Sequence, residues 1–129
     1  MPDSGPGDSG ADCSVSLTAT DFVISCPGGF VDEVVTQAPG KLVYPCAGGR
    51  ASAFFGTHEF AGNVTQDEVD VCLRTDFDYD DGCHWLAAHR ITGVLATGTL
   101  DYRYDESPAP GRLDCLPPCF ATAKLIVGP

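Results

Sequence analysis

The chain has 129 residues, which is enough for one domain with a hydrophobic core. Seven Lys and Arg against eighteen Asp and Glu give a formal net charge of −11, which repels phosphate backbones and argues against nucleic acid as a partner. No stretch approaches the roughly eighteen consecutive apolar residues of a membrane-spanning helix, so no transmembrane segment is expected.

The cysteine content indicates where the protein resides. Seven cysteines in so short a chain, with fifteen Gly and ten Pro, predict an oxidising, extracytoplasmic location: secreted, periplasmic or at the cell surface. Structural zinc is the alternative explanation, but the cysteines are scattered and no CxxC occurs, which argues against it. Polar residues follow Met1 directly, so the sequence shows no signal peptide.

The beginning of the chain differs in composition from the rest. Apart from Met1, residues 1–12, MPDSGPGDSGAD, are small, turn-forming and acidic, with nothing to bury against a core. We expect a disordered tether here, followed by a single β domain over residues 13–129.

The first segment of that domain, CSVSLTATDFVISC, changes its pattern half-way. Apolar residues fall on odd positions in its first half and on even positions in its second half. A hairpin that turns through residues 18–21 explains the change, and it would place Cys13 opposite Cys26. A single strand bent by a bulge at Thr20 and Asp21 explains it equally well.

Apolar segments and turn residues then alternate. Pro39 and Gly40 occupy the second and third positions of a predicted type II turn over residues 38–41. A short strand around Glu59 and Phe60 is expected inside a loop. The other expected strands cover residues 30–37, 42–46 and 51–55, and the loop covers residues 56–66.

The stretch from Val69 to Tyr104 contains the most distinctive residues, including the only Trp. Its beginning, VDVCLRTDFDY, alternates apolar with polar residues, and so does its end, VLATGTLDYRY, so each predicts a half-buried strand. Residues 84–90, between them, are the only helix candidate. A proline-rich loop is expected at residues 107–119, and residues 121–127 alternate again and predict a closing strand.

The spacing of these segments indicates the fold class. Expected strands recur at intervals of roughly ten residues, and Gly and Pro separate them. The two half-buried strands of the central stretch also need a common core. The sequence therefore predicts an all-β fold, either an antiparallel β-sandwich or a small barrel, stabilised by disulfide bonds.

Seven cysteines allow three disulfide bonds and one spare thiol. Cys72 and Cys83 bracket the acidic segment, and a loop of that length closes easily, so we expect them to pair. Cys13 pairs with Cys26 if the first hairpin forms. A turn at Pro117-Pro118 would let Cys115 pair with Cys119, although the residues before each proline favour extended angles. Cys46 is then the spare thiol.

Asp76, Asp78 and Asp80 lie at alternate positions, as the first oxygen ligands of a calcium loop do. The glycine that should follow comes one position late, and the twelfth position carries no acid, so the EF-hand pattern fails. A different Ca²⁺ site built on these carboxylates remains an alternative, but we expect no tight one and no other cofactor. His84 and His89 are five residues apart, which places them on one face of neither a helix nor a strand, so they are not expected to share a metal.

Four aromatic residues lie near the acidic ones in sequence: Tyr79, Trp85, Tyr102 and Tyr104. Aromatic rings beside carboxylates suit a carbohydrate or a cationic ligand, although the same residues could equally fill the core. No GxSxG motif and no phosphate-binding glycine loop occurs, and no residue is a specific catalytic candidate. The sequence therefore favours a non-catalytic, secreted or envelope-anchored domain that binds a carbohydrate or protein partner. The alternative is a secreted hydrolase with an acidic active site.

The polar leader, DFDYDDGCHW, ITGVLATGTLDYRYDESP and CLPPCFATAKLIV together resemble the cysteine-rich lipoproteins of myxobacteria and their relatives. The resemblance covers most of the chain beyond Asp12 and consists of strand and cysteine pattern rather than of a diagnostic motif. It implies a location in the cell envelope, with a lipid anchor upstream of residue 1, and it implies no known activity. This sequence departs from that pattern because it lacks the export and lipidation segment.

Overall fold

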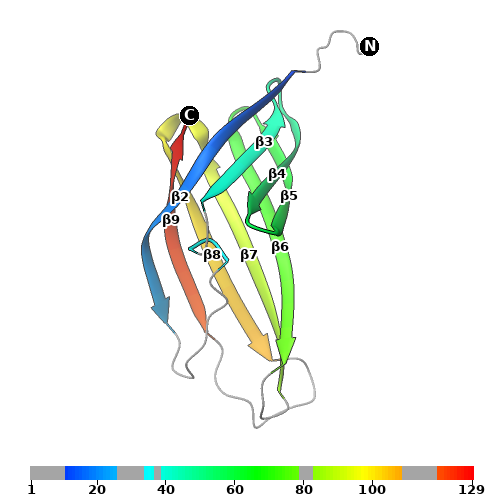
Figure 1. Cartoon of the computed structure of the whole chain (residues 1–129), viewed down its shortest axis with the longest axis vertical. Helices are drawn as coiled ribbons and strands as arrows, with labels where there is room; N and C mark the ends of the chain where they lie inside the picture. The colour runs from blue at the N-terminus through cyan, green and yellow to red at the C-terminus, as the bar shows by residue number, and fades with distance from the viewer. Residues whose placement is uncertain (1–10, 26–33, 37–38, 79–82, 109–118) are drawn as a thin grey trace.

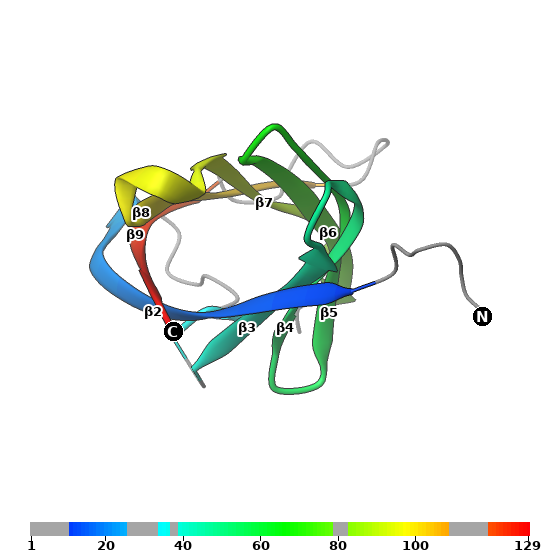
Figure 2. The same cartoon turned by 90° about the horizontal axis from the view of Figure 1, so that it is seen from above.

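The computed structural model describes residues 11–25, 34–36, 39–78, 83–108 and 119–129 (Figure 1). Eight antiparallel strands form a closed barrel, in which each strand lies beside the next and the last, β9, pairs with the first, β2. Seen from above, the strands form a ring (Figure 2). The prediction of an all-β fold is confirmed, and the barrel is the correct alternative. The strands are β2 (Asp12–Ser25), β3 (Gly40–Pro45), β4 (Gly49–Phe55), β5 (His58–Thr65), β6 (Glu68–Asp78), β7 (His84–Val94), β8 (Thr99–Pro108) and β9 (Phe120–Gly128).

Strand β2 is a single bent strand and not a hairpin. It pairs with β3 from Asp12 to Leu17, and its second half pairs with β9. The register with β9 shifts between Thr20 and Val23, and Asp21 within this bulge has a φ of 53°. The bulge interpretation is therefore confirmed. The bulge has a physical reason in the closure of the barrel. Where its pairing with β3 ends, β2 must bend to stay paired with β9.

Strand β7 occupies the place of the expected helix at residues 84–90, so that prediction is wrong. Trp85, His89 and Ile91 alternate with outward residues and are buried. The period of two is hard to see in the sequence because Leu86 is apolar but faces outward, where it is 43% exposed.

Three further expectations are wrong. Residues 34–36 form a turn rather than the end of a strand, and β5 extends over eight residues where the sequence predicts a loop with a short strand. Gly40 begins β3 without the positive φ of a type II turn. A Cβ atom at Gly40 would lie 2.3 Å from the Phe55 ring, so glycine is required here by close packing and not by a turn.

The strand expected from Val94 onward is interrupted by a short 3-10 turn, η1 (Leu95–Thr97). Gln66 and Asp67 form the two-residue connection between β5 and β6, both with positive φ, as in a type I′ hairpin. The Asp67 carbonyl accepts a hydrogen bond from the Leu95 N–H, and its carboxylate accepts one from the Ala96 N–H, each at 2.9 Å. Two connections at one end of the barrel are thereby joined. No helix among the described residues is long and apolar enough to span a bilayer.

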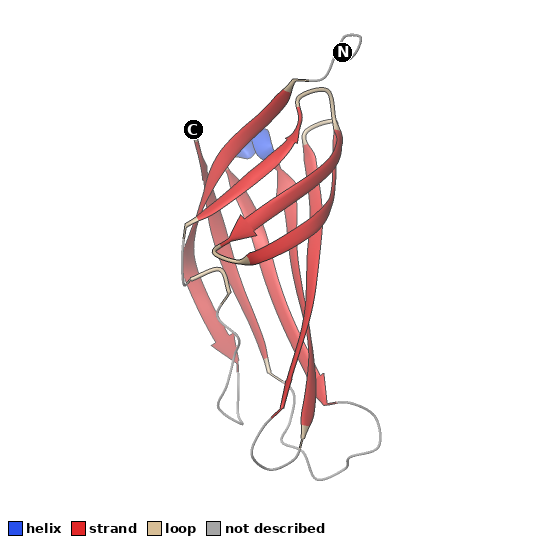
Figure 3. Cartoon of the chain, turned by 45° about the vertical axis from the view of Figure 1, so that its right-hand side comes forward, coloured by secondary structure: helices blue, strands red, loops and turns tan. Residues whose placement is uncertain are grey.

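Strands β6 to β9 form the broadest part of the barrel wall. Strand β6 pairs with β7 along its whole length, from Glu68 to Asp78, but with β5 only as far as Cys72. Figure 3 shows the long strands running past the shorter ones. The outward side of β6 to β9 is therefore a continuous, gently twisted surface four strands wide.

Side chains fill the interior of the barrel. An eight-stranded barrel is just wide enough for its inward side chains to pack against one another or to hold one small ligand. Here the inward positions carry large side chains with less than 2% exposure, among them Phe55, Phe60, Trp85, Tyr102 and Tyr104.

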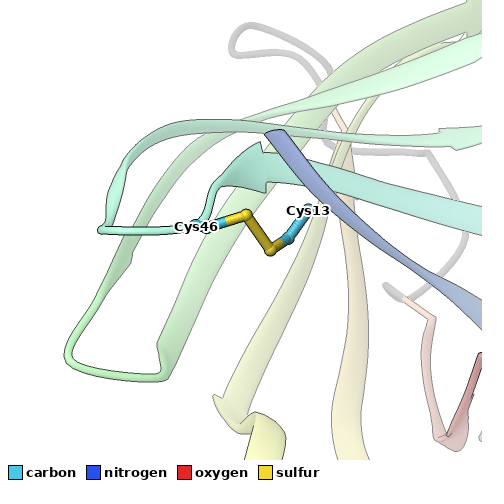
Figure 4. Close-up of a disulfide and its surroundings, with 2 residues drawn as sticks. All are labelled: Cys13 and Cys46. Atoms are coloured by element: carbon cyan, nitrogen blue, oxygen red, sulfur yellow. A yellow bond between two sulfur atoms is a disulfide. The ribbon is translucent and has the colours of Figure 1, made fainter. Parts of the chain in front are cut away.

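One disulfide bond joins Cys13 near the start of β2 to Cys46 just after β3, with an S–S distance of 2.00 Å (Figure 4). The two predictions that Cys13 pairs with Cys26 and that Cys46 is the spare thiol are therefore wrong. The reason is that β2 does not turn back on itself, so the strand beside Cys13 is β3. The expected tether lies outside the described residues except for its last two positions, and the second of these, Asp12, already begins β2.

Cys72 is exposed and free, so the predicted pairing of Cys72 with Cys83 is also wrong. Cys72 lies on the outward side of β6, whereas Cys83 is buried and disulfide-bonded. Cys119 is disulfide-bonded as well. The predicted pairing of Cys119 with Cys115 stays a prediction, because Cys115 lies outside the described residues. Cys26 lies outside them as well.

Candidate functional site

The outward side of β6 to β9, called the outer face below, carries an ordered set of charges. Every ion pair that joins two described residues lies on it. The Arg90 guanidinium donates two hydrogen bonds to the Asp70 carboxylate, at 3.0 and 2.7 Å, and Lys124 pairs with Asp101. The hydrogen bond from Arg90 holds the pKa of Asp70 below its usual value.

His84 lies between two carboxylates at the end of this face. Its Nδ1 is 2.7 Å from the Asp78 carboxylate and its Nε2 is 3.2 Å from the Asp76 carboxylate. The hydrogen bond with Asp78 is the main reason why the pKa of His84 is raised above its usual value, and the charges of both carboxylates raise it further. His84 therefore gains positive charge at a higher pH than an isolated histidine does.

Arg103 on β8 and Phe120 at the start of β9 form a short exposed ridge on the outer face. The Arg103 guanidinium lies 4.6 Å from the centroid of the Phe120 ring, a cation–π contact. Along one edge of the guanidinium, Nε and Nη2 donate hydrogen bonds to the Asp105 carboxylate, at 2.9 and 2.8 Å, which raise the pKa of Arg103. Phe120 is nevertheless 40% exposed. An arginine and an aromatic ring are thus held in one orientation while they remain open to solvent.

An open groove lies on each side of this ridge, which is called the Arg103–Phe120 ridge below. The first groove, of about 500 Å³, runs over β6, β7 and β8. The second, of about 510 Å³, runs over β8, β9 and β2. Outward residues that line the first are Arg74, Asp76, Leu86, Ala88, Asp105 and Ser107. Those that line the second include Asp21, Val23, Asp101, Thr122 and Lys124.

Exposed apolar side chains also concentrate here. Seven large apolar side chains among the described residues are exposed, and six of them lie on the outer face or on the adjoining part of β2. Leu86, Val94, Phe120 and Ile126 lie on the outer face, and Val23 and Ile24 lie on β2. The combination of apolar side chains with paired charges distinguishes this face from the rest of the described surface.

The residues that the sequence suggests for ligand binding lie elsewhere. Trp85, Tyr102 and Tyr104 are 1%, 1% and 0% exposed, so their rings belong to the core and not to a surface site. Tyr79 lies outside the described residues. The prediction of an aromatic binding surface on Trp85, Tyr102 and Tyr104 is therefore corrected, because strand parity directs all three side chains inward.

These inward residues form a buried polar cluster. The His89 ring contacts the Tyr102 hydroxyl through Nδ1 at 2.8 Å and the Thr75 hydroxyl through Nε2 at 3.1 Å. The Tyr104 hydroxyl donates to the Glu106 carboxylate. His89 is 0% and Glu106 is 4% exposed, so this cluster stabilises the interior rather than facing a substrate.

Two of the three predicted calcium ligands, Asp76 and Asp78, lie within the described residues. Asp76 and Asp78 both contact His84, and Asp80 lies outside the described residues. Within the part of the chain that the structure describes, no group of three His, Cys, Asp or Glu side chains is arranged to hold a metal ion.

Sequence reasoning did not find the Arg103–Phe120 ridge. The two residues are seventeen positions apart in the chain, and only the pairing of β8 with β9 brings them together. The available signal is an aromatic residue at the polar parity of a predicted strand, since Phe120 precedes the inward Ala121. Comparison of the chain with protein-family models, with curated proteins and with solved structures found no match.

Proposed function

We propose that this chain is a non-catalytic, extracytoplasmic β-barrel domain that binds a protein partner through its outer face. The observation that carries the proposal is the Arg103–Phe120 ridge, flanked by two grooves and surrounded by exposed apolar side chains. Arginine and aromatic residues are the types that most often anchor protein interfaces.

A protein partner is favoured over a carbohydrate. Sugars are usually bound by flat aromatic rings that lie open at a surface, and Trp85, Tyr102 and Tyr104 are buried here. The outer face instead presents guanidinium groups whose geometry is already fixed by carboxylates. Because those guanidinium groups are ordered before binding, they lose less side-chain entropy when a partner docks on them.

A non-catalytic role is favoured by the histidines of β7. Both ring nitrogens of His84 contact carboxylates, and both of His89 contact the hydroxyls of Thr75 and Tyr102. Neither ring presents a nitrogen to the Ser107 hydroxyl in the first groove, so neither is placed as the general base of a hydrolase.

An extracytoplasmic location is supported by the disulfide bonds. Cys13 and Cys46 are joined, and Cys83 and Cys119 are each bonded, so four of the five described cysteines are oxidised. Such bonds persist in secreted and envelope proteins and are rare in the cytosol.

Site-specific photo-crosslinking in the cells that make the protein tests this function. Benzoylphenylalanine replaces Leu86 on the outer face in one variant and Phe54 on β4 in the control. The two residues are similarly exposed, 43% and 39%, and their strands lie on opposite sides of the barrel (Figure 2). We expect a discrete protein adduct from position 86 only. Equal adducts from both positions, or none from either, would overturn the proposal, as would hydrolytic activity lost in Asp76→Asn.

A further inference from the structure

We propose that the free side of β2 binds a basic, extended segment of a partner protein, which joins the barrel wall as an added strand. This site lies at a strand edge rather than on the outer face, so the inference goes beyond the proposed function. Three observations carry it: open backbone groups, an exposed apolar pair, and a carboxylate with which no described residue forms an ion pair.

The second half of β2 has a neighbouring strand on one side only. Its pairing with β3 ends where Leu17 meets Gly40, whereas its pairing with β9 continues to Ser25. In Figure 1 this half of β2 continues past β3 with β9 beside it. No described residue pairs with β2 beyond Leu17 on the side that β3 leaves. Residues 18–25 therefore form an open edge, at which alternate residues present an N–H and a C=O outward.

These backbone groups indicate what kind of molecule the edge binds. They are matched by another extended polypeptide, because its own C=O and N–H groups recur at the same spacing. Strand edges that avoid such pairing usually carry Lys, Pro or several charges. Residues 18–25 contain no Lys or Pro, and Asp21 is their only charged residue. The bulge at Asp21 interrupts the edge, so the added strand lies along the residues that follow it, as far as Ser25.

Two adjacent apolar side chains are exposed on this part of the edge. Val23 is 62% and Ile24 is 46% exposed. Val23 lies opposite the outward Thr122, and Ile24 lies opposite the inward Ala121, so the two side chains are on opposite sides of the sheet. An added strand covers both side chains at once, which a surface resting on the outside of the barrel does not. The partner segment is therefore expected to carry two adjacent apolar residues.

Asp21 indicates the charge of the partner segment. Its side chain is exposed, and it forms no ion pair with any residue that the structure describes. The chain as a whole carries a formal charge of −11, so it attracts a cationic segment. A Lys or Arg close to the apolar pair of that segment can then pair with Asp21. The occupant is thus a basic strand with two adjacent apolar residues.

Amide hydrogen exchange of the oxidised full chain, followed by NMR, tests whether the edge is open. On each side of the Asp21 bulge, amides that face β9 should exchange slowly. Their neighbours, which face the open edge, should exchange at least tenfold faster. Equal protection of all amides from Thr18 to Ser25 would overturn the inference, because the edge would then already be occupied.

A defined peptide tests the occupant. The probe is a short capped peptide with two adjacent valines between threonine and lysine residues, added to the full chain. We expect saturable binding that slows exchange of the edge-facing β2 amides at least tenfold. N-methylation of both valines removes the donors that strand addition needs and should raise the dissociation constant at least tenfold. N-methylation of two terminal residues is the control and should change it less than threefold. No binding to the wild-type chain would overturn the inference.

Two isoleucines provide a matched pair of variants. Ile24 and Ile126 are 46% and 45% exposed, and Ile126 lies between the paired strands β2 and β8. Ile24→Lys should raise the dissociation constant of the peptide at least tenfold. Ile126→Lys changes the net charge equally and should leave it within twofold. Val23→Lys repeats the test in case Ile24→Lys does not fold. Equal weakening by Ile24→Lys and Ile126→Lys would place the peptide on the outer face and overturn the inference.

Discussion

Gly62 shows how strongly a single residue can constrain this barrel. A Cβ atom there would lie 2.0 Å from the backbone oxygen of Asp70 and 2.8 Å from the Cα of Val71. Those atoms belong to the neighbouring strand and cannot rotate away as a side chain can. We expect Gly62→Ala to lower the free energy of unfolding by about 1 to 3 kcal/mol, measured by urea denaturation. The adjacent exposed position is the control: Ala61→Ser should change it by less than about 0.5 kcal/mol.

His84 should respond to pH in a direction fixed by its neighbours. Because Asp78 raises its pKa, the stability it contributes is fully present below the ordinary value of 6.5 and is lost as the pH rises through the folded value. Asp78→Asn should move the His84 pKa down toward 6.5, measured by NMR titration of the imidazole signals. Asp101→Asn, on β8, is the control and should leave it unchanged. An unchanged His84 titration in Asp78→Asn would contradict the assigned cause.

At the scale of elements, the β5–β6 hairpin carries avoidable backbone strain. Gln66 has a φ of 50°, a conformation that ordinary side chains adopt only at some cost, whereas Asn and Gly adopt it readily. We expect Gln66→Asn to raise the free energy of unfolding by a few tenths to about 1 kcal/mol, seen as a higher melting temperature. Gln66→Ala keeps the strain and should bring no gain. A lower melting temperature for Gln66→Asn would mean that the Gln66 side chain makes a contact worth more than the strain.

The bulge in β2 and the glycine at the start of β3 illustrate how elements adapt to closure. The alternating sequence of β2 predicts two half-strands of opposite parity. The first half shows its pattern in the structure, whereas in the second half Phe22 is partly buried but Ile24 is 46% exposed. Whether the halves fold back or continue depends on which neighbours they meet, and the barrel supplies β3 for one half and β9 for the other. Local pattern therefore predicts the strands, and the neighbouring strands decide the register.

At the scale of the whole molecule, the Cys13–Cys46 bond ties the start of the barrel to its second strand. Residues 33 positions apart are joined, which restricts the unfolded chain. We expect the double substitution Cys13→Ser/Cys46→Ser to lower the free energy of unfolding by roughly 2 to 5 kcal/mol, measured by denaturant titration under oxidising conditions. Cys72→Ser, which removes a free and exposed thiol, should leave stability within about 0.5 kcal/mol. Peptide mapping without reduction checks the connectivity, and a fragment joining Cys13 to Cys26 would refute it.

The sequence by itself determined the properties that depend on neighbours along the chain. A period of two over residues 69–78 and 121–127 specifies which side chains face inward, because successive residues of a strand point to opposite sides. The spacing of strand and turn segments likewise indicated an all-β domain, and the cysteine content indicated disulfide bonds. The segment from His84 to Arg90 is the exception. Apolar residues occupy both inward and outward positions there, and over so short a length this pattern is indistinguishable from that of a helix.

Only the tertiary structure decided what depends on residues far apart. Closure of β2 on β9 selected the barrel over the sandwich, and the pairing of β2 with β3 placed Cys13 beside Cys46. The pairing of β8 with β9 brought Arg103 to Phe120 and so formed the ridge of the candidate site. Pattern along a strand shows which way a side chain points but not which strand lies next to it, because that choice is made by the packing of the whole core at once.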